Sequence, residues 1–383
     1  MRYLADSIAE DLGRRMVFVA GPRQAGKTTL VKSFLTKFTP GKYINYDNPE
    51  GRAAFMKRTW NETDKVIILD EIHKYSRWKN YLKGIYDVEK EQHKFLVTGS
   101  TRLDLYRRGQ DSMFGRYALW RLHPFCLAEL NSLKLDRHTP QKRMQLLLQH
   151  SGFPEPYLAA NEKITRRWRL ERLDLVFRQD IREIEKIKDI YLLEQLHNLL
   201  KTQVAGQVNY ANLARDMDVT AKTIKSWIEV LEHSYALFQI RPHHSKLARA
   251  ILKQPKIYFY DNGDAEGDGG AKFENLVANH LLKRLHFLQD GTGHRYELCY
   301  LRDKEKHEVD FVVVKDKKPV ALIEAKWADI NPHRALAYFG DRLGVKTRIQ
   351  LVAEGAQKKT HRDCVVWPAA EWLSQPLEKD IFS

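Results

Sequence analysis

The segment "GPRQAGKTTL" (residues 21–30) constrains the fold of this chain more than any other. It follows a short apolar run, "RRMVFVAG" (14–21), and leads into "TTLVKSFLTKF" (28–38), whose apolar residues recur at helical spacing. A glycine-rich segment between a strand and a helix can turn its backbone N–H groups toward one point, where they hold phosphate. The spacing G-x-x-x-x-G-K-[ST] therefore predicts a phosphate-binding loop in an α/β domain, because a chance match would lack the strand and the helix.

Each residue of the predicted loop has a candidate role. Lys27 should reach the β- and γ-phosphates of ATP, and the Thr28 hydroxyl should ligate Mg²⁺. ATP and Mg²⁺ are therefore the expected cofactors. The predicted nucleotide-binding residues are Gly21, Pro22, Arg23, Gln24, Ala25, Gly26, Lys27, Thr28, Thr29 and Ser100.

Two further apolar runs end in polar residues. "KVIILDE" (65–71) ends in Asp70 and Glu71, and "HKFLVTGSTR" (93–102) ends in small hydroxyl residues that include Ser100. Asp70 should hold Mg²⁺ through water, Glu71 should polarise the attacking water, and Ser100 should sense the γ-phosphate. The alternative for the acidic pair is a solvated strand end. Strands that alternate with helices predict a parallel sheet covered on both faces.

An arginine is expected to stabilise charge in the transition state. The candidate is Arg116 in "MFGRYALWRL" (113–122), acting within its own subunit or on a neighbouring one. Arg107, Arg108 and Arg121 compete for this role. A surface salt bridge is the alternative for each of them.

The order of these motifs resembles that of the AAA-type ATPases of bacteria and archaea with a C-terminal DUF4143 region (AAA_14/DUF4143). The resemblance implies a nucleotide-hydrolysing core, a winged-helix-like middle and a nuclease-like C-terminal end. Two departures weaken the sensor assignment: His73 and Tyr75 stand where the family pattern has glutamine and proline, and "TGSTR" replaces a more serine-rich run. The matching segments are "GPRQAGKTTL", "ILDEIHKYSRWKNYLKGIYD", "VTGSTRLDL", "GRYALWRLHPFCLAEL", "SGFPEPYL", "FRQDI", "FENLVANHLL" and "EVDFVVV…IEAKW".

The middle of the chain changes character at about Pro140, where strand-like runs stop and apolar residues follow helical spacing. Within it, "VNYANLARDMDVTAKTIKSWIEVL" (208–231) reads as helix, turn and helix. The second helix offers Lys222 and Lys225, three residues apart on one face, to DNA phosphates. The alternative is a winged helix that serves only as a packing module.

A second unusual stretch, "EVDFVVVKDKKPVALIEAKW" (308–327), predicts a hairpin with charged residues on an otherwise apolar face. Asp310, Glu324 and Lys326 should converge at one end of it. The pattern resembles the PD-(D/E)xK nuclease core, which implies Mg²⁺ on Asp310 and Glu324, with Lys326 orienting the attacking water. Glu274 on the preceding helix is a candidate further ligand. The alternatives are an ordinary charged hairpin and a nuclease fold retained only to bind DNA.

The predicted fold class is α/β, with a P-loop ATPase parallel sheet, a helical and winged-helix middle and a C-terminal α/β nuclease-like domain. The stretch "DAEGDGG" (264–270) has the composition of a linker. The predicted domains are 1–135 (P-loop AAA-type ATPase), 136–205 (helical linker or lid), 206–263 (winged-helix-like) and 264–383 (nuclease-like).

The charge and composition of the chain predict its kind of partner and its location. A formal net charge of +15 indicates an anionic partner, for which duplex or branched DNA is the leading candidate. The chain has no apolar stretch of about 18 residues, which predicts no membrane contact, and a first segment unlike a signal peptide, which predicts a cytoplasmic location. Its three cysteines lie far apart, without metal-ligand spacing.

The leading hypothesis is an ATP-hydrolysing, DNA-processing homo-oligomeric ring, for which a hexamer is the candidate, with a metal-dependent nuclease-like domain. One alternative is an ATP-dependent regulatory or defence switch that acts on a protein partner and has a catalytically silent nuclease-like domain. Another is a metal nuclease gated by ATP.

Overall fold

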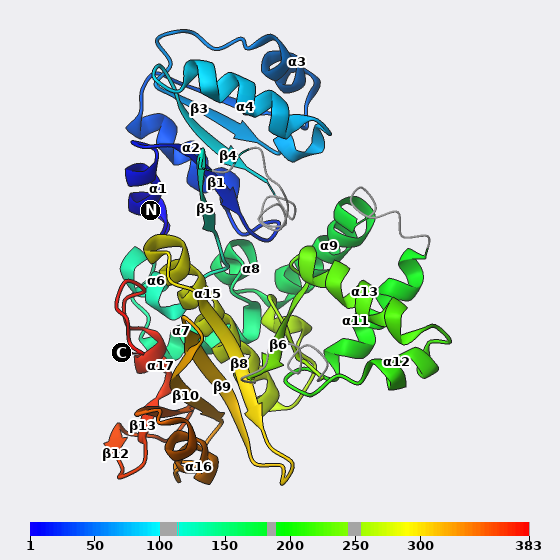
Figure 1. The fold of residues 1–383 in the computed structure, drawn as a ribbon, viewed down its shortest axis with the longest axis vertical. Coiled ribbons are helices and arrows are strands. Elements are labelled where there is room, and N and C mark those ends of the chain that lie inside the picture. Colours follow the sequence, from blue (N-terminus) through cyan, green and yellow to red (C-terminus); the bar gives the residue numbers. More distant parts are fainter. Residues whose placement is uncertain (100–112, 114, 182–188, 244–253, 383) are drawn as a thin grey trace. The chain divides into compact units, whose positions relative to one another are not determined.

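The structure is a computed structural model that describes residues 1–99, 113, 115–181, 189–243 and 254–382 (Figure 1). The chain divides into two compact units. Unit 1 comprises residues 1–124 with 233–235, and unit 2 comprises 125–232 with 236–383. In the described part of the chain, every helix is too short or too polar to cross a membrane.

Unit 1 is built on a five-stranded parallel sheet in the order β2-β3-β4-β1-β5. All residues of β1 and β3 are buried, which explains their continuous apolar sequence. The strands are β1 (Met16–Ala20), β2 (Gly41–Asn45), β3 (Val66–Asp70), β4 (Lys94–Thr98) and β5 (Tyr117–Arg121). The helical elements are α1 (Ala5–Asp11), α2 (Lys27–Lys37), α3 (Pro49–Lys57), η1 (Ile72–Lys74) and α4 (Trp78–Glu89).

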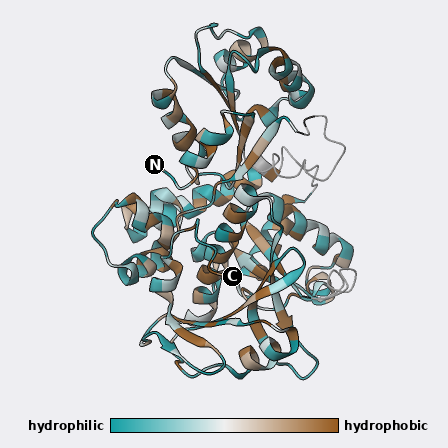
Figure 2. Ribbon diagram, turned by 60° about the vertical axis from the view of Figure 1, so that its left-hand side comes forward, coloured by the Kyte–Doolittle hydropathy of each residue, from teal (hydrophilic) through white to brown (hydrophobic). Residues whose placement is uncertain are grey.

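Alternation along the strands sends apolar side chains to both faces of this sheet. Met16 and Phe18 of β1 belong to a core cluster with Trp78 and Leu82 of α4. Hydrophobic residues therefore follow the strands, and hydrophilic ones lie on the outer helix faces (Figure 2). The predicted parallel sheet of the α/β class is confirmed.

The parallel register places the carboxyl ends of the central strands at one edge of the sheet. Asp70, the last residue of β3, pairs with Thr98, the last residue of β4. Ala20, at the end of β1, pairs with Arg121 at the end of β5. The segment that joins β1 to α2 leaves the sheet at this edge, which is where ligands bind in open α/β sheets.

The first half of unit 2 is helical, as predicted from about Pro140 onward. Several of these helices start with a side chain that caps the first turn, among them Thr139, Asn161 and Asn209. The helical elements are α6 (Leu127–Leu133), α7 (Pro140–His150), α8 (Pro154–Ala159), α9 (Glu162–Leu175), the π-helix η3 (Val176–Ile181), α11 (Ile190–Lys201), α12 (Tyr210–Asp216) and α13 (Ala221–His233).

The rest of unit 2 forms an eight-stranded mixed sheet in the order β12-β13-β11-β10-β9-β8-β6-β7. Its strands are β6 (Leu237–Pro242), β7 (Lys256–Phe259), β8 (Tyr296–Arg302), β9 (Glu308–Lys315), β10 (Lys318–Lys326), β11 (Thr347–Val352), β12 (Lys359–Thr360) and β13 (Val365–Pro368). Its helical elements are η4 (Asn262–Asp264), α15 (Gly269–Thr292), α16 (Arg334–Leu343) and α17 (Ala369–Leu373). The sheet crosses the predicted boundary at 263/264, because β6 and β7 belong to it.

The predicted hairpin at 308–327 is present as β9 and β10. Lys315 pairs with Lys318, and the two residues between them, Asp316 and Lys317, both have positive φ (48° and 68°). Two left-handed residues in a two-residue loop are the pattern of a type I′ turn, whose twist matches that of the strands.

The segment 264–270 is not the linker that its composition suggests. Asp264 is fully buried, 3.6 Å from both Arg172 Nη1 and Lys201 Nζ, and Ala265 is part of the core. The Asp268 side chain accepts the Ala271 N–H and so starts α15. Composition misled here because ion pairs with residues far away in the sequence leave no local signal.

A buried histidine, His280, makes the stability of unit 2 depend on pH. Its Nε2 lies 3.1 Å from the Leu127 N–H, which it accepts, so its Nδ1–H must donate to the Leu276 carbonyl 2.8 Å away. Burial lowers the pKa of His280 to about 4. The neutral ring is therefore the form that fits the fold.

We expect the free energy of unfolding to fall as the pH drops from about 6.5 toward 4. In this window the unfolded chain binds a proton at His280 that the folded chain cannot bind, at a cost of up to about 1.4 kcal/mol per pH unit. Urea unfolding of unit 2 at several pH values measures the slope. His280→Gln should make it shallower, whereas His138→Gln, at an exposed histidine, should not. Equal slopes in the wild type and His280→Gln would contradict this account.

Candidate functional sites

The loop between β1 and α2 has the backbone of an anion site. Gln24 (φ 63°) and Gly26 (φ 92°) are left-handed, which turns successive N–H groups to one side. Gly26 precedes α2 without any side-chain cap, so the first N–H groups of the helix are available. Gly21 is required because a Cβ there would lie 2.1 Å from the Leu122 carbonyl oxygen.

Lys27 lies inside this loop. Its Nζ donates to the carbonyl oxygens of Gly21 and Pro22, both at 2.9 Å, and the residue is 6% exposed. The predicted phosphate-binding lysine is thus held at the loop itself. Gln24 Oε1 is buried at the same loop, with no hydrogen-bond partner among the described residues.

Two N-terminal residues, Arg2 and Tyr3, form hydrogen bonds to the backbone at and near the loop. The Arg2 guanidinium donates to the Ala25 carbonyl (2.6 Å) and to the His123 carbonyl (2.7 Å). The Tyr3 hydroxyl donates to the Arg121 carbonyl at 2.8 Å. No local pattern in the sequence predicts these contacts, because the partners are 23, 121 and 118 residues apart.

Asp70 is the centre of a hydroxyl cluster at the carboxyl edge of the sheet. Its carboxylate accepts the hydroxyls of Thr28 (2.9 Å), Tyr43 (2.7 Å) and Thr98. The structure thus brings Thr28 and Asp70, the two predicted Mg²⁺ ligands, into contact. Their oxygen donors suit a hard cation such as Mg²⁺.

Tyr43 is a member of this cluster that the sequence analysis missed. Burial raises the pKa of its phenol, and the neighbouring Asp70 raises it further, so the hydroxyl stays protonated and donates. Lys32 Nζ lies 4.3 Å from the centre of its ring. The sequence "KYINYD" predicts a strand that contains Tyr43. Only the pairing of β2 with β3 shows that this strand lies next to Asp70.

Glu71 lies next to Asp70 with a left-handed backbone (φ 58°). Its Oε2 is buried, has no hydrogen-bond partner among the described residues, and lies 3.6 Å from His73 Nε2. Burial raises the pKa of Glu71 to about 7, although Lys27 opposes the shift. A carboxylate with a pKa near neutrality, free of a hydrogen bond at one oxygen, has the properties of a general base.

The remaining predicted nucleotide-site residues are only partly placed. Thr28 and Thr29 are exposed at the start of α2, and Arg23 is half-buried in the loop. Ser100, Arg107 and Arg108 lie outside the described residues.

Arg116 lies at the opposite edge of the sheet from the phosphate loop. It directly precedes β5, its carbonyl accepts the Met16 N–H at the start of β1, and its guanidinium contacts both oxygens of Asp87 (2.7 and 3.1 Å). Arg121, at the carboxyl end of β5, is on the same edge as the loop. This placement therefore does not support a role for Arg116 at the nucleotide of its own subunit.

The second predicted site brings Asp310, Glu324 and Lys326 together on β9 and β10. Lys326 Nζ lies 2.6 Å from Glu324 Oε1. Glu324 Oε2 accepts the Asp310 N–H (3.2 Å), and Asp310 Oδ2 accepts the Ala325 N–H (3.1 Å). The alternation of side chains along paired strands produces this convergence.

Lys256 on β7 also enters this site, and the sequence analysis missed it. Its Nζ lies 2.7 Å from Glu308, 3.1 Å from Glu274 and 3.4 Å from Asp310. Burial lowers the pKa of Lys256, but the three carboxylates together raise it well above its ordinary value. The ammonium is therefore charged. No local pattern marks Lys256, because its partners Glu274, Glu308 and Asp310 lie far from it in the sequence and β7 is not a neighbour of β9 in the sheet.

Glu274 lies at this cluster as predicted, but as a partner of Lys256 and of the Tyr258 hydroxyl (2.7 Å). Burial, and then the Asp310 charge, raises the pKa of Glu274 to about 7 and that of Glu324 to about 8. Both side chains therefore hold a proton more readily than an exposed glutamate does.

A closely spaced group of potential metal-ligand atoms lies elsewhere in the described chain. Within the described ranges, the only three His, Cys, Asp or Glu residues whose ligand atoms all lie within 4.8 Å of one another are Asp303, Glu305 and His307. That group is largely exposed on the loop between β8 and β9. Glu274, Asp310 and Glu324 do not together meet the same condition in this structure.

The predicted helix-turn-helix is formed by α12 and α13. Thr220 Oγ1 accepts the Thr223 N–H before the first turn of α13. Lys222 and Lys225 are both exposed, and Lys225 Nζ lies 4.0 Å from Glu229. Trp227 packs against the hydrophobic core. The two lysines are thus accessible to a phosphate backbone.

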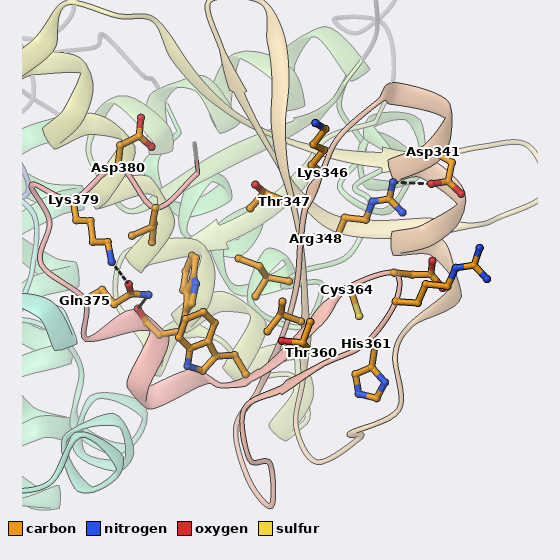
Figure 3. Close-up of a pocket in the computed structure, with 17 residues that line it drawn as sticks. Asp341, Lys346, Thr347, Arg348, Thr360, His361, Cys364, Gln375, Lys379 and Asp380 are labelled. Carbon is orange, nitrogen blue, oxygen red and sulfur yellow. Dashed lines mark hydrogen bonds and ion pairs between the residues drawn. The ribbon is translucent and has the colours of Figure 1, made fainter.

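A separate groove of about 810 Å³ lies beside β11 and β13 (Figure 3). Its cations Lys346, Arg348, Arg362 and Lys379 are balanced in part by Asp341, Asp363 and Asp380. Arg348 is bound to Asp341 at 2.7 Å. None of the predicted site residues lines this groove.

Three protein families match successive parts of the chain. Residues 13–131 match AAA_14, described as an AAA domain. Residues 141–265 match DUF8612 and residues 269–372 match DUF4143, each described as a domain of unknown function. The first match and the phosphate-loop fold support an AAA-type ATPase and suggest ATPase activity, which implies nucleotide binding.

The curated relatives are distant. Uncharacterized protein Rv2008c of Mycobacterium tuberculosis is 24% identical over 250 residues, which cover 65% of this chain and 54% of that protein. The chain thus spans about half the length of this relative. Uncharacterized protein MJ1544 of Methanocaldococcus jannaschii is 23% identical over 349 residues, covering 83% of this chain and 76% of that protein.

Solved structures with similar folds are also distant. The Walker-type ATPase PABY2304 of Pyrococcus abyssi has a TM-score of 0.42 at 16% identity, covering 68% of this chain and 93% of that one. The ORC1 protein of Aeropyrum pernix, in complex with DNA, has a TM-score of 0.36 at 11% identity, covering 74% and 94%. Likenesses at this level do not bear on function.

Proposed function

We propose that the protein hydrolyses ATP at the phosphate loop of unit 1 and couples this hydrolysis to the binding of DNA. One observation carries the first part. At the carboxyl edge of the sheet, Asp70 holds the Thr28 hydroxyl, and beside it the buried carboxylate of Glu71 has one oxygen without a hydrogen bond from any described residue.

The loop supplies the binding part of the mechanism. Its N–H groups and the uncapped start of α2 receive the phosphates, and Lys27 exchanges its two carbonyl partners for phosphate oxygens. Thr28 and Asp70 are the residues that would hold Mg²⁺. The chemistry that Mg²⁺ supplies when bound is neutralisation of charge on the phosphate oxygens.

Glu71 supplies the proton acceptor. Its carboxylate takes a proton from the attacking water, for which a pKa near neutrality is suited. The hydroxyls of Tyr43 and Thr98 hold Asp70 in place. Asp70 would therefore help to hold Mg²⁺, whereas Glu71 accepts the proton. Ser100 remains the proposed γ-phosphate sensor.

We further propose that the protein acts as a homo-oligomeric ring, with a hexamer as the candidate. In such a ring Arg116 would act on the nucleotide of a neighbouring subunit, because it lies at the far edge of its own sheet from the phosphate loop. Its present partner, Asp87, would have to release it in that assembly.

DNA is the proposed partner because the chain carries a net charge of +15 and exposes Lys222 and Lys225 on one helix face. The decisive experiment measures the ATPase rate with and without single-stranded, duplex and four-way DNA, and follows cleavage on gels. We expect DNA to raise the rate. Turnover that DNA leaves unchanged would favour the alternative, a regulatory switch whose partner is a protein.

DNA binding should weaken steeply with salt, because each neutralised phosphate of a duplex releases counterions. The slope of log affinity against log salt is about −0.9 per phosphate contact. Binding to a fluorescent duplex at several salt concentrations measures it. Lys222→Ala with Lys225→Ala should flatten the slope by about 1.8, two contacts at this value. Lys163→Ala, at an exposed position on α9, should leave it unchanged. A flat dependence in the wild type would exclude a phosphate-based contact.

A further inference from the structure

We propose that the ammonium group of Lys256 occupies the place of a divalent metal ion in the carboxylate cluster of the C-terminal sheet. In consequence, the cluster binds neither Mg²⁺ nor Mn²⁺, and the domain does not cut nucleic acid. This site is separate from the nucleotide site, so the inference stands independently of the proposed ATPase.

The position of Lys256 is that of a central cation. Its Nζ lies within 3.4 Å of oxygens from three carboxylates, Glu274 on α15 and Glu308 and Asp310 on β9. Its side chain is 3% exposed. A buried positive charge surrounded by carboxylates from two elements meets the requirement that such charges be paired.

The cluster oxygens that do not contact Lys256 also have partners within the chain. Asp310 Oδ2 accepts the Ala325 N–H, and Glu324 Oε2 accepts the Asp310 N–H. Glu324 Oε1 faces Lys326 Nζ at 2.6 Å and His333 Nδ1 at 3.3 Å. A metal ion at these oxygens would compete with the ammonium of Lys326 for Glu324 Oε1, and it would lie next to the Lys256 ammonium, which has the same sign.

The charges at the cluster are already largely balanced. Glu308 shares its carboxylate between Lys256 and Arg302, whose Nη1 lies 2.6 Å from Oε2. Lys326 offsets Glu324. Two carboxylates without cations would attract a divalent ion, but these carboxylates have their cations within the chain.

Lys256 cannot withdraw easily, because β7 is fastened to α15. The Asn275 side chain accepts the Phe259 N–H (2.7 Å) and donates to the Phe259 carbonyl (3.1 Å). The Tyr258 hydroxyl, two residues from Lys256, donates to Glu274 (2.7 Å). The strand that carries the lysine and the helix that carries a predicted metal ligand therefore hold each other in place.

The test is a Mn²⁺ titration of the full-length protein without nucleotide, followed by the electron paramagnetic resonance signal of free Mn²⁺. Any Mn²⁺ bound at the nucleotide site is common to all variants. We expect wild type and Asp310→Asn to bind the same number of ions. Lys256→Met should bind one more, and the double variant Lys256→Met with Asp310→Asn should lose it again. Lys272→Met, at an exposed lysine near the start of α15, should match the wild type.

Two results would overturn the inference. One is a Mn²⁺ ion in the wild type that Asp310→Asn removes, or Mn²⁺-dependent cleavage that Asp310→Asn abolishes. The other is a folded Lys256→Met that gains no ion, since the ammonium would then not be what excludes it. If circular dichroism shows that Lys256→Met is unfolded, the test rests on the number of Mn²⁺ ions bound by wild type, Asp310→Asn and Glu324→Gln. A smaller number in either variant would overturn the inference.

Discussion

Lys27→Ala should lower the rate of ATP hydrolysis by about 10²–10³-fold and leave the fold intact. The size follows from losing one positive group that stabilises charge as it develops on the transferred phosphoryl group. In the structure Lys27 Nζ is held only 2.9 Å from two carbonyls of the loop, so it needs little movement to reach a phosphate in the same loop. Release of inorganic phosphate under saturating ATP measures the effect.

Lys37→Ala is the matched control, because Lys37 lies on the same helix and is exposed at its other end. It should hydrolyse ATP at the wild-type rate. Thermal unfolding monitored by circular dichroism should show that both variants fold. Undiminished turnover in a folded Lys27→Ala would remove the ATPase assignment.

Glu71→Gln should bind ATP and fail to hydrolyse it. The amide keeps the shape of the side chain and leaves Thr28 and Asp70 untouched, but it cannot accept a proton from water. The expected loss in turnover is about 10²–10⁴-fold, the usual contribution of a positioned general base. Fluorescent ATP-analogue binding should change much less, so Glu71→Gln should accumulate the ATP-bound state, which Lys27→Ala should not.

Glu50→Gln serves as the control for Glu71→Gln, because Glu50 is an exposed acid in the first turn of α3 in the same unit. It should retain full turnover. If Glu71→Gln hydrolyses ATP normally, another group must activate the water. A variant that loses binding together with turnover would instead assign Glu71 to holding the site together.

Much of the proposed nucleotide site could be predicted from the sequence because its determinants are local. The two glycines, Lys27 and Thr28 occupy consecutive positions between a strand and a helix, and their roles follow from backbone conformation. Asp70 and Glu71 were found because a continuous apolar run ends at them, and a buried parallel strand ends at the edge where ligands bind. The hairpin of β9 and β10 was equally readable from alternation and a charged turn.

The tertiary structure alone decided which distant residues join these sites. Tyr43 touches Asp70 because β2 pairs with β3. Lys256 lies 3.4 Å from Asp310 although β6 and β8 separate its strand from β9 in the sheet order. Arg116 was a candidate for the nucleotide of its own or of a neighbouring subunit, and the strand register places it at the opposite edge of the sheet from the phosphate loop. Periodicity in a sequence fixes which face a side chain takes within its own element, but neither the order of strands nor the distance between charges. Burial and the distances to neighbouring charges set the pKa of Glu71 and of Lys256. The chemistry proposed for both sites therefore depends on the assembled sheets.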